Sequence, residues 1–265
     1  MRRILNYKRE LRGAFILMKR VIINADDFGL NQSCTEAICE AFKKKLITDA
    51  TLVANGESFD YAVQEIKKKD LKDKVGIHIN LTEGIPLTES IKECPEFVTN
   101  GVFHGKILRF KPLDKCTRKK VYNEMIAQIE KIEKAGILIS HADSHHHIHT
   151  AIFIAPIFMK VCREKGIEKI RIHRNVGNIQ LYKRIGKYIY NLWVKLKQFK
   201  TVRYFGMMND IEKIGVFDNM EIMVHPEYDV NRKLIDKIEE ENGYPVGKIL
   251  RLPKEKISLR GYKDI

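Results

Sequence analysis

Short apolar runs alternate along the chain with longer segments of helical character, and this alternation limits the folds that the chain can adopt. The apolar runs have the composition of buried strands, and they are residues 21–23, 50–53, 74–81, 137–139, 169–172 and 220–224. The predicted helices are residues 32–45, 58–69, 118–135, 156–165, 178–200 and 231–241. Strands that alternate with helices form βαβ units, whose strands lie parallel in one sheet. We therefore predict the α/β fold class.

Side chains that commonly bind metals occur at the ends of several predicted strands. Asp26 and Asp27 follow the first strand, His78 lies in the third, and His225 directly follows the last. Residues 140–149 follow the fourth strand and contain five of the chain's nine histidines. Because the carboxyl ends of parallel strands converge on one site, we expect these side chains to share a pocket. Ligand-type residues after so many strands favour a closed or nearly closed (β/α)-barrel over an open sheet.

The histidine run at residues 140–149 indicates a metal site. Buried neutral imidazoles each need a hydrogen-bond partner, and clustered imidazolium ions repel one another. A divalent metal relieves both problems, because neutral imidazole is a common metal ligand. The alternative is a solvated histidine-rich loop or a tag, but this run lies mid-chain between apolar segments.

The adjacent carboxylates Asp26 and Asp27 predict a division of roles at this site. Two carboxylates so close repel unless a cation or a shared proton intervenes, and a metal bound by one leaves the other free as a base. Each residue also has a simpler interpretation: the Asp pair as a helix cap, His78 as a core histidine, and His225 as a loop histidine. One Asp and two His around an open metal form a plausible hydrolytic site, which lowers the pKa of water from about 15.7 toward ~7–9. With no G-x-S-x-G motif and no phosphate-binding glycine loop, the residues alone predict a metal-dependent hydrolase.

Length and segment composition predict the domain organisation. The 265 residues suit one large domain or two small ones, and we predict a single catalytic domain over residues 18–265 after a basic N-terminal extension at residues 1–17. Residues 84–116 and 174–213 interrupt the βα pattern, and we interpret them as insertions. The second insertion is rich in Tyr and Lys, and we expect its aromatic side chains to pack against the domain or to line a groove.

Charge and cysteine content bear on partners and location. The formal net charge of +14 raises the alternative of a basic nucleic-acid-binding protein. The lysines are spread along predicted helices without a recognised nucleic-acid-binding motif, so we expect no nucleic-acid partner. No apolar run approaches the ~18 residues of a membrane span, and we expect no membrane partner. The five cysteines are scattered without a C-x-x-C pair, which favours a reducing, cytoplasmic location.

Three segments of the chain resemble the YdjC-like carbohydrate deacetylase family, which includes chitooligosaccharide deacetylases. They are residues 24–29 (NADDFG), 76–84 (GIHINLTEG) and 141–149 (HADSHHHIH), and the late His225-Pro226 completes the family's order. The resemblance extends from about residue 19 to residue 241. It implies a (β/α)-barrel-like fold of the polysaccharide deacetylase type, in which the barrel can be irregular or incomplete. It also implies a divalent metal, Mg²⁺ before Zn²⁺ or another ion, and removal of acetyl groups from N-acetylated sugars.

Position in these segments implies a role for each candidate residue. By the resemblance, the metal ligands are Asp27, His78 and His145. Asp26 corresponds to the general base, and His225 to a general acid or oxyanion partner. For His147 and His149 three roles remain open, which are metal ligand, supporting group around the metal and substrate contact. The implied substrate is an N-acetylated mono- or oligosaccharide such as diacetylchitobiose. A metal-dependent hydrolase of another amide, ester or phosphoester remains the alternative, and a homo-oligomer stays open.

Overall fold

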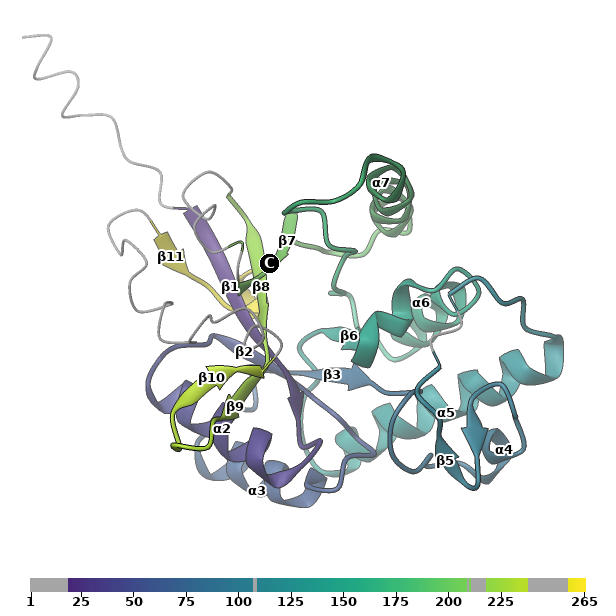
Figure 1. The fold of residues 1–265 in the computed structure, drawn as a ribbon, viewed down its shortest axis with the longest axis horizontal. Coiled ribbons are helices and arrows are strands. Elements are labelled where there is room, and N and C mark those ends of the chain that lie inside the picture. The colour runs from purple at the N-terminus through teal and green to yellow at the C-terminus, as the bar shows by residue number, and fades with distance from the viewer. Residues whose placement is uncertain (1–18, 107–108, 209, 211–217, 238–256) are drawn as a thin grey trace, which may run out of the picture.

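A curled parallel sheet is the frame of the computed structural model, which describes residues 19–106, 109–208, 210, 218–237 and 257–265 (Figure 1). The strand order is β6-β3-β2-β1-β8-β7, with β11 also paired to β1, and every pair in this sheet is parallel. The strands are β1 (Lys19–Phe28), β2 (Asp49–Leu52), β3 (Val75–Ile79), β6 (Ala142–Ser144), β7 (Tyr204–Met207), β8 (Met220–Val224) and β11 (Ile257–Leu259). The predicted α/β class with a parallel sheet is confirmed.

The curl of the sheet brings its two edge strands toward each other. Figure 1 shows β2, β3 and β6 crossing the molecule while β1 and β8 stand nearly upright. Isolated parallel bridges join Ala142 to Ile170 and Lys169 to Lys200, so the segment at 169–170 partly spans the gap between β6 and the residues before β7. This arrangement is an incomplete (β/α)-barrel, as predicted.

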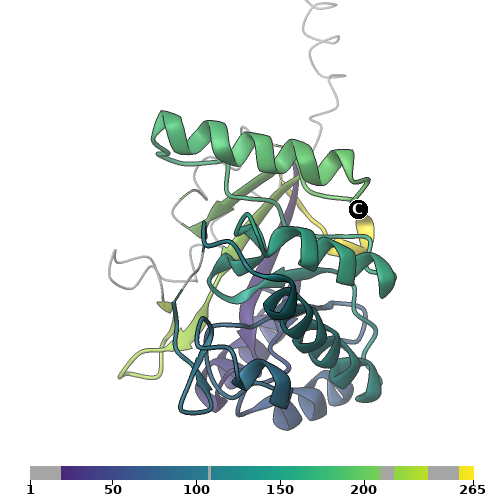
Figure 2. The ribbon, with the colours of Figure 1, turned by 90° about the vertical axis from the view of Figure 1, so that its right-hand side faces the viewer.

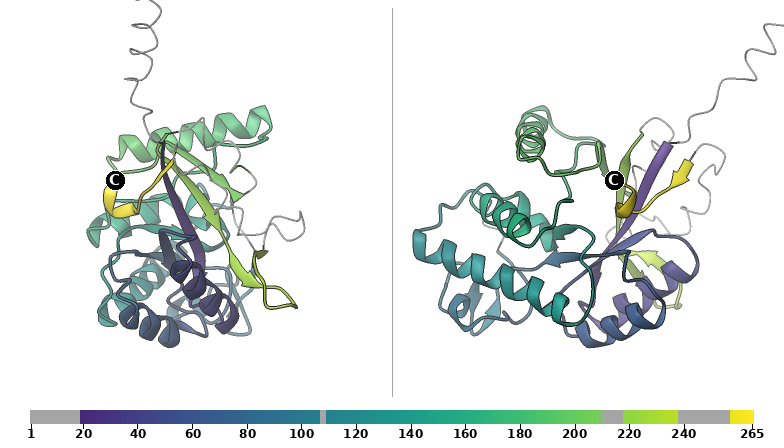
Figure 3. Two further views of the ribbon diagram at one scale, coloured as in Figure 1. Left: turned by 90° about the vertical axis from the view of Figure 1, so that its left-hand side faces the viewer. Right: turned by 180° about the vertical axis from the view of Figure 1, so that it is seen from behind.

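The outside of the sheet is covered by helices α2 (Gln32–Lys43), α3 (Phe59–Lys68), α5 (Lys115–Lys134) and α6 (Ala155–Glu164) (Figures 1 and 3). The short α4 (Glu89–Lys92) packs on α5, and α7 (Leu181–Leu196) lies at one end of the protein beyond α6. Side-chain caps fix where two of them begin: Asn31 accepts a hydrogen bond from the Cys34 N–H, and Asp114 accepts one from the Thr117 N–H. None of the helices in the described ranges is long and apolar enough to cross a bilayer.

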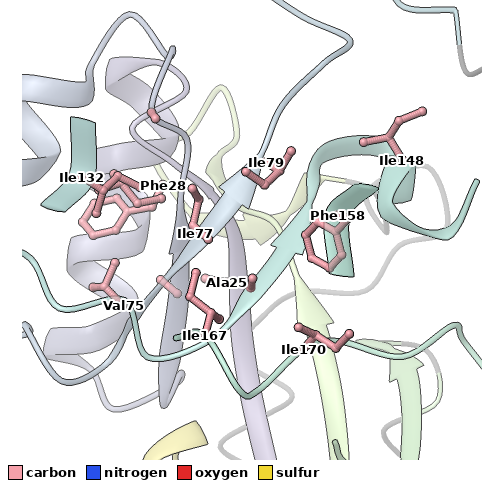
Figure 4. Close-up of a cluster of buried hydrophobic side chains, with 14 of the residues drawn as sticks. Ala25, Phe28, Val75, Ile77, Ile79, Ile132, Ile148, Phe158, Ile167 and Ile170 are labelled. Carbon is pink, nitrogen blue, oxygen red and sulfur yellow. The ribbon is translucent and has the colours of Figure 1, made fainter. Parts of the chain in front are cut away.

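Alternate positions of the strands serve two different environments. Outward-facing residues such as Ala25 and Ile77 join the apolar cluster with Ile132 of α5 and Phe158 of α6 (Figure 4). The intervening positions carry a small second apolar cluster, which includes Ile22 and Met223, and a larger set of buried polar residues, among them Asn24, Asp26, Thr51, His78, Asp143 and Glu221. Because strand side chains alternate between faces, the apolar outer face anchors the helices while the inner face is left for polar chemistry.

Two antiparallel hairpins extend from the sheet. The first, β4 (Val98–Thr99) with β5 (Val102–Phe103), lies inside the predicted insertion at 84–116. The second, β9 (Pro226–Tyr228) with β10 (Leu234–Asp236), replaces the first part of the helix predicted over 231–241, so that prediction is wrong across residues 231–236. The Asp229 side chain accepts hydrogen bonds from the backbone N–H groups of Asn231 and Lys233, and this turn reverses the chain.

Two predicted strands differ from the observed ones. The predicted strand at 137–139 lies before the sheet: Leu138 is exposed, and the chain joins β3 only from the Ser140 N–H, which donates to the Val75 carbonyl. The predicted strand at 169–172 forms only isolated bridges, because its residues pair with two different partners. The predicted extension at residues 1–17 lies outside the described residues.

Candidate active site

The three predicted metal ligands lie together at the carboxyl ends of β1, β3 and β6. The Asp27 Oδ1 atom is 3.2 Å from His78 Nε2 and 2.7 Å from His145 Nδ1. One ligand atom from each of the three residues lies within 4.8 Å of the others. Two imidazoles and a carboxylate, with other coordination positions left open, are a donor set that suits a divalent metal in a hydrolytic site.

Left-handed backbone conformations orient the side chains of this cluster. Asp27 has a φ of 68°, next to a register irregularity between β1 and β2 at residues 25–28. This conformation, which Asp tolerates better than most residues, turns the chain so that both Asp26 and Asp27 face the site. His146 and His147 have φ values of 52° and 53° and kink the 3₁₀ segment His145–Thr150. Such strained residues concentrate at functional sites.

Each histidine of the cluster also contacts a second carboxylate. His78 Nδ1 is 2.6 Å from Asp143 Oδ1, and His145 Nε2 is 3.0 Å from Glu83 Oε2. When the second carboxylate accepts the N–H of its imidazole, the other ring nitrogen, which faces Asp27, keeps its lone pair for a metal ion, as in many metal sites. Asp143 and Glu83 lie in the segments that resemble the family, but neither was predicted to have a role at the site.

These carboxylates also control the protonation of the two imidazoles. Burial disfavours the charged form of His78, but the charge and hydrogen bond of Asp143, with the hydrogen bond of Asp27 and the charge of Asp26, together outweigh burial and raise its pKa to about 10. Burial likewise opposes protonation of His145, whereas its hydrogen bonds with Asp27 and Glu83 raise its pKa to about 9. Protons therefore compete with a metal for these nitrogens, and metal binding must displace them.

Two other groupings of ligand-type atoms overlap the cluster within the described residues: Asp26 with His78 and Asp143, and Glu83 with His145 and His146. The first already holds a cation, because Arg171 Nη1 lies 2.6 Å from Asp26 Oδ2 and 2.5 Å from Asp143 Oδ2. The second depends on Glu83 and His146, which are exposed. The Asp27 cluster is therefore the better metal site.

Asp26 is held by other partners than the Asp27, His78 and His145 cluster, as an ionised carboxylate. The Arg171 guanidinium binds it with two hydrogen bonds of 2.6 and 2.7 Å, and Asn24 Nδ2 donates to its Oδ1 at 2.9 Å. Burial raises the pKa of Asp26, but the charge and hydrogen bonds of Arg171, with the charges of His78 and His225, together outweigh burial and hold the pKa well below its usual range. Arg171 was not among the predicted site residues, although a charged residue inside the apolar run at 169–172 was an available signal.

His225 lies between two carboxylates, those of Asp26 and Asp236. Its Nε2 is 3.8 Å from Asp26 Oδ2, and its Nδ1 is 3.8 Å from Asp236 Oδ1. Burial favours the neutral ring, yet the interaction with Asp236 and the charges of Asp26 and Asp27 raise the pKa of His225. Asp236 falls in the segment predicted as helix, so its place beside His225 was not foreseen.

His147 and His149 do not join the three-residue cluster. His149 is buried, its Nδ1 is 2.6 Å from the Ser144 Oγ, and within the described chain its Nε2 has no hydrogen-bond partner. The His147 ring packs edge-on against Phe205, with 5.9 Å between centroids, and its pKa is lowered by burial and by Arg171. The pKa of His149 is likewise lowered by burial, so both rings are neutral and lie beside the cluster rather than in it.

Sequence comparison places the chain among enzymes that act on carbohydrates. The family model described as YdjC-like protein matches residues 20–248. Carbohydrate deacetylase 1 of Listeria innocua is 32% identical over 210 residues, which cover 79% of this chain and 82% of the relative. A carbohydrate deacetylase of Clostridium beijerinckii is 29% identical over 260 residues, which cover 93% of this chain and 100% of the relative.

Solved structures show the same fold. A protein of Enterococcus faecalis described as a putative cellobiose-phosphate cleavage protein matches with a TM-score of 0.69 at 22% identity, over 93% of this chain and 98% of its own. The lactam utilization protein of Thermus thermophilus matches with a TM-score of 0.51 at 11% identity, over 91% of this chain and 99% of its own. The family match includes all the segments whose side chains meet at the site. This chain therefore belongs to the YdjC-like family, as its motifs predicted.

Proposed function

We propose that this protein is a carbohydrate deacetylase that removes acetyl groups from N-acetylated sugars with a divalent metal held by Asp27, His78 and His145. The observation that carries the proposal is that a possible metal site and a possible general base lie side by side. A carboxylate and two carboxylate-backed imidazoles form a metal-type cluster, and a separate ionised carboxylate, Asp26, lies beside it. The activity named for relatives at about 30% identity agrees with this chemistry.

The donor set bears on which metal the cluster would hold. A divalent ion there would supply a Lewis acid that polarises the acetamide carbonyl and lowers the pKa of water. The family resemblance implies Mg²⁺, whereas two imidazole donors suit Zn²⁺ or another transition metal better than Mg²⁺. Metal analysis of the purified protein distinguishes these ions.

In the proposed reaction, Asp26 and His225 move the protons. Water adds to the acetamide carbon while Asp26, kept ionised by Arg171, accepts a proton from it. The carbon–nitrogen bond then breaks, and His225 donates a proton to the leaving nitrogen. The raised pKa of His225 favours the protonated ring that this step requires. The products are acetate and the free amino sugar.

Acetate release from N,N'-diacetylchitobiose, with and without a chelator, tests the proposed function. We expect release that a chelator abolishes and that added divalent metal restores. Chelator-resistant release would contradict the metal role. Hydrolysis of an ester or phosphoester, without acetate release from any N-acetylated sugar, would contradict the deacetylase assignment.

Removing either proposed imidazole ligand should lower metal content and activity together. We expect His78→Ala and His145→Ala each to weaken metal binding by more than the ~10–100-fold typical of losing a supporting group around a metal. Metal analysis after dialysis measures the effect. His104→Ala is the matched control, because His104 lies on the loop after β5 and hydrogen-bonds the Pro95 carbonyl. Full metal occupancy in either ligand variant would refute that residue's role.

A further inference from the structure

Helix α7 presents a continuous apolar stripe to solvent. Its exposed large apolar side chains are between 44% and 73% accessible, and they are Leu181, Tyr182, Ile185, Tyr188, Ile189, Leu192 and Leu196. Successive spacings of one, three and four residues place all of them on one side of the helix. The opposite side packs on the protein through buried Tyr190, Asn191 and Val194. An exposed patch of this kind on an otherwise ordinary surface marks an interaction site.

The stripe faces away from the rest of the molecule. In Figures 1 and 2, α7 lies along one end of the protein, beyond α6 and β7, and no helix or strand of the described chain covers its outer side. The buried side is anchored firmly, because the Tyr190 hydroxyl donates to the His149 carbonyl and the Asn191 side chain bonds both backbone groups of His173. The helix is therefore fixed in place with its apolar side outward.

Positive charge accompanies the stripe. Residues 178–200 contain six Lys or Arg residues and no Asp or Glu; the cations are Lys183, Arg184, Lys187, Lys195, Lys197 and Lys200. Lys200 forms an ion pair with Glu168. Within the described chain, Arg184, Lys187 and Lys195 have no carboxylate at ion-pair distance.

A basic cavity runs along one edge of the stripe. Its volume is about 360 Å³, and five of its lining residues are cationic: Arg174, Arg184, Lys187, Lys195 and Arg203. Asp210 pairs with Arg174 at 2.9 Å. Burial and the nearby charges of Arg174, Arg109 and Lys183 lower the pKa of Lys187, which reflects the crowding of cations here. Such a cavity, beside an apolar surface, suits the phosphate of a lipid headgroup.

We propose that α7 lies in the surface of an anionic phospholipid bilayer, with its apolar stripe among the lipids and its basic edge at their phosphates. Amphipathic helices that lie in the membrane plane combine these two features. A second copy of the chain is a poorer occupant, because stripe-to-stripe contact would bring two uncompensated cationic edges together. The proposal departs from the expectation of no membrane partner, which rested on the lack of a spanning segment. It is independent of the reaction at the metal site.

Flotation of the full chain with vesicles tests this attachment. We compare vesicles of phosphatidylcholine alone with vesicles of phosphatidylcholine and phosphatidylglycerol in equal amounts. We expect clear preference for the anionic vesicles. The double variant Ile185→Glu with Ile189→Glu should bind at least about tenfold more weakly, because it puts charge into the stripe. Arg184→Gln and Lys195→Gln should each weaken binding to the anionic vesicles by about fivefold and leave binding to phosphatidylcholine vesicles unchanged.

A matched control separates the stripe from exposed apolar residues in general. Val230, on the turn between β9 and β10, is 99% exposed, and Val230→Glu should leave vesicle binding unchanged. Circular dichroism and acetate release from a soluble sugar check that the α7 variants are folded. No binding to anionic vesicles, or equal binding by wild type and the double variant, overturns the proposal. So does a dimer in sedimentation equilibrium that the double variant abolishes, since the occupant would then be a second copy.

Discussion

Asp26→Asn is expected to lower kcat for acetate release by about 10²–10⁴-fold while the metal content stays at the wild-type level. The amide has the shape of the carboxylate but cannot accept a proton from water. The proposed metal ligands are untouched, because the cluster is formed by Asp27, His78 and His145. Paired metal analysis and steady-state kinetics on the same preparation measure both quantities.

Asp27→Asn is the matched comparison for this experiment. The two aspartates are adjacent in sequence, but Asp27 contacts both imidazoles whereas Asp26 is held by Arg171. We expect Asp27→Asn to lose metal and activity together. Loss of metal from Asp26→Asn would instead make Asp26 a ligand in the alternative grouping with His78 and Asp143. Wild-type turnover in Asp26→Asn would remove Asp26 from the role of base.

The residues that the sequence predicted at the site share one property: each follows or lies in a recognisable strand. Asp26, Asp27, His78 and His225 were found because parallel strands align their carboxyl ends, so local patterns sufficed. Arg171 was missed because its partners Asp26, Glu221 and Asp143 come from other strands, up to 145 residues away in sequence. Only the curl of the sheet brings these side chains to a common centre, and no local pattern encodes that curl.

Two other segments also show that local sequence patterns do not encode tertiary contacts, here between residues closer in sequence. The helix predicted from residue 231 gave way to β10, because a turn held by the side chain of Asp229 overrode the helical pattern. On α7, the sequence predicted a helix with packed or groove-lining aromatics. Periodicity reveals that one side of such a helix is apolar, but only the packing of Tyr190 and Val194 shows that the larger apolar side faces outward.

Replacing Arg171 by methionine should cause the largest loss of stability of any change considered. Arg171 is fully buried and pairs with Asp26, Asp143 and Glu221 at distances of 2.5 to 2.8 Å. Removing one partner of a buried ion pair typically costs about 3–5 kcal/mol, because it leaves an uncompensated charge in the interior. Here one cation serves three carboxylates, so we expect a free energy of unfolding reduced by at least this amount. Urea unfolding, or failure to recover soluble protein, reports the effect.

The pH dependence of the same variant tests whether charge, rather than lost packing, is the cause. In the wild type, Arg171 holds the pKa of Asp26 below its unfolded value, so this contribution to stability is present above the unfolded pKa and is lost as pH falls. Without Arg171, burial raises the pKa values of Asp26 and Glu221, and their protonation relieves the repulsion. The stability difference between Arg171→Met and wild type should therefore shrink as pH falls from neutral toward ~4. Arg20→Met is the matched control, because Arg20 pairs with Asp218 at the surface, and its loss should cost no more than about 1 kcal/mol. A difference for Arg171→Met that does not change with pH would assign the loss to packing, since uncharged contacts do not titrate.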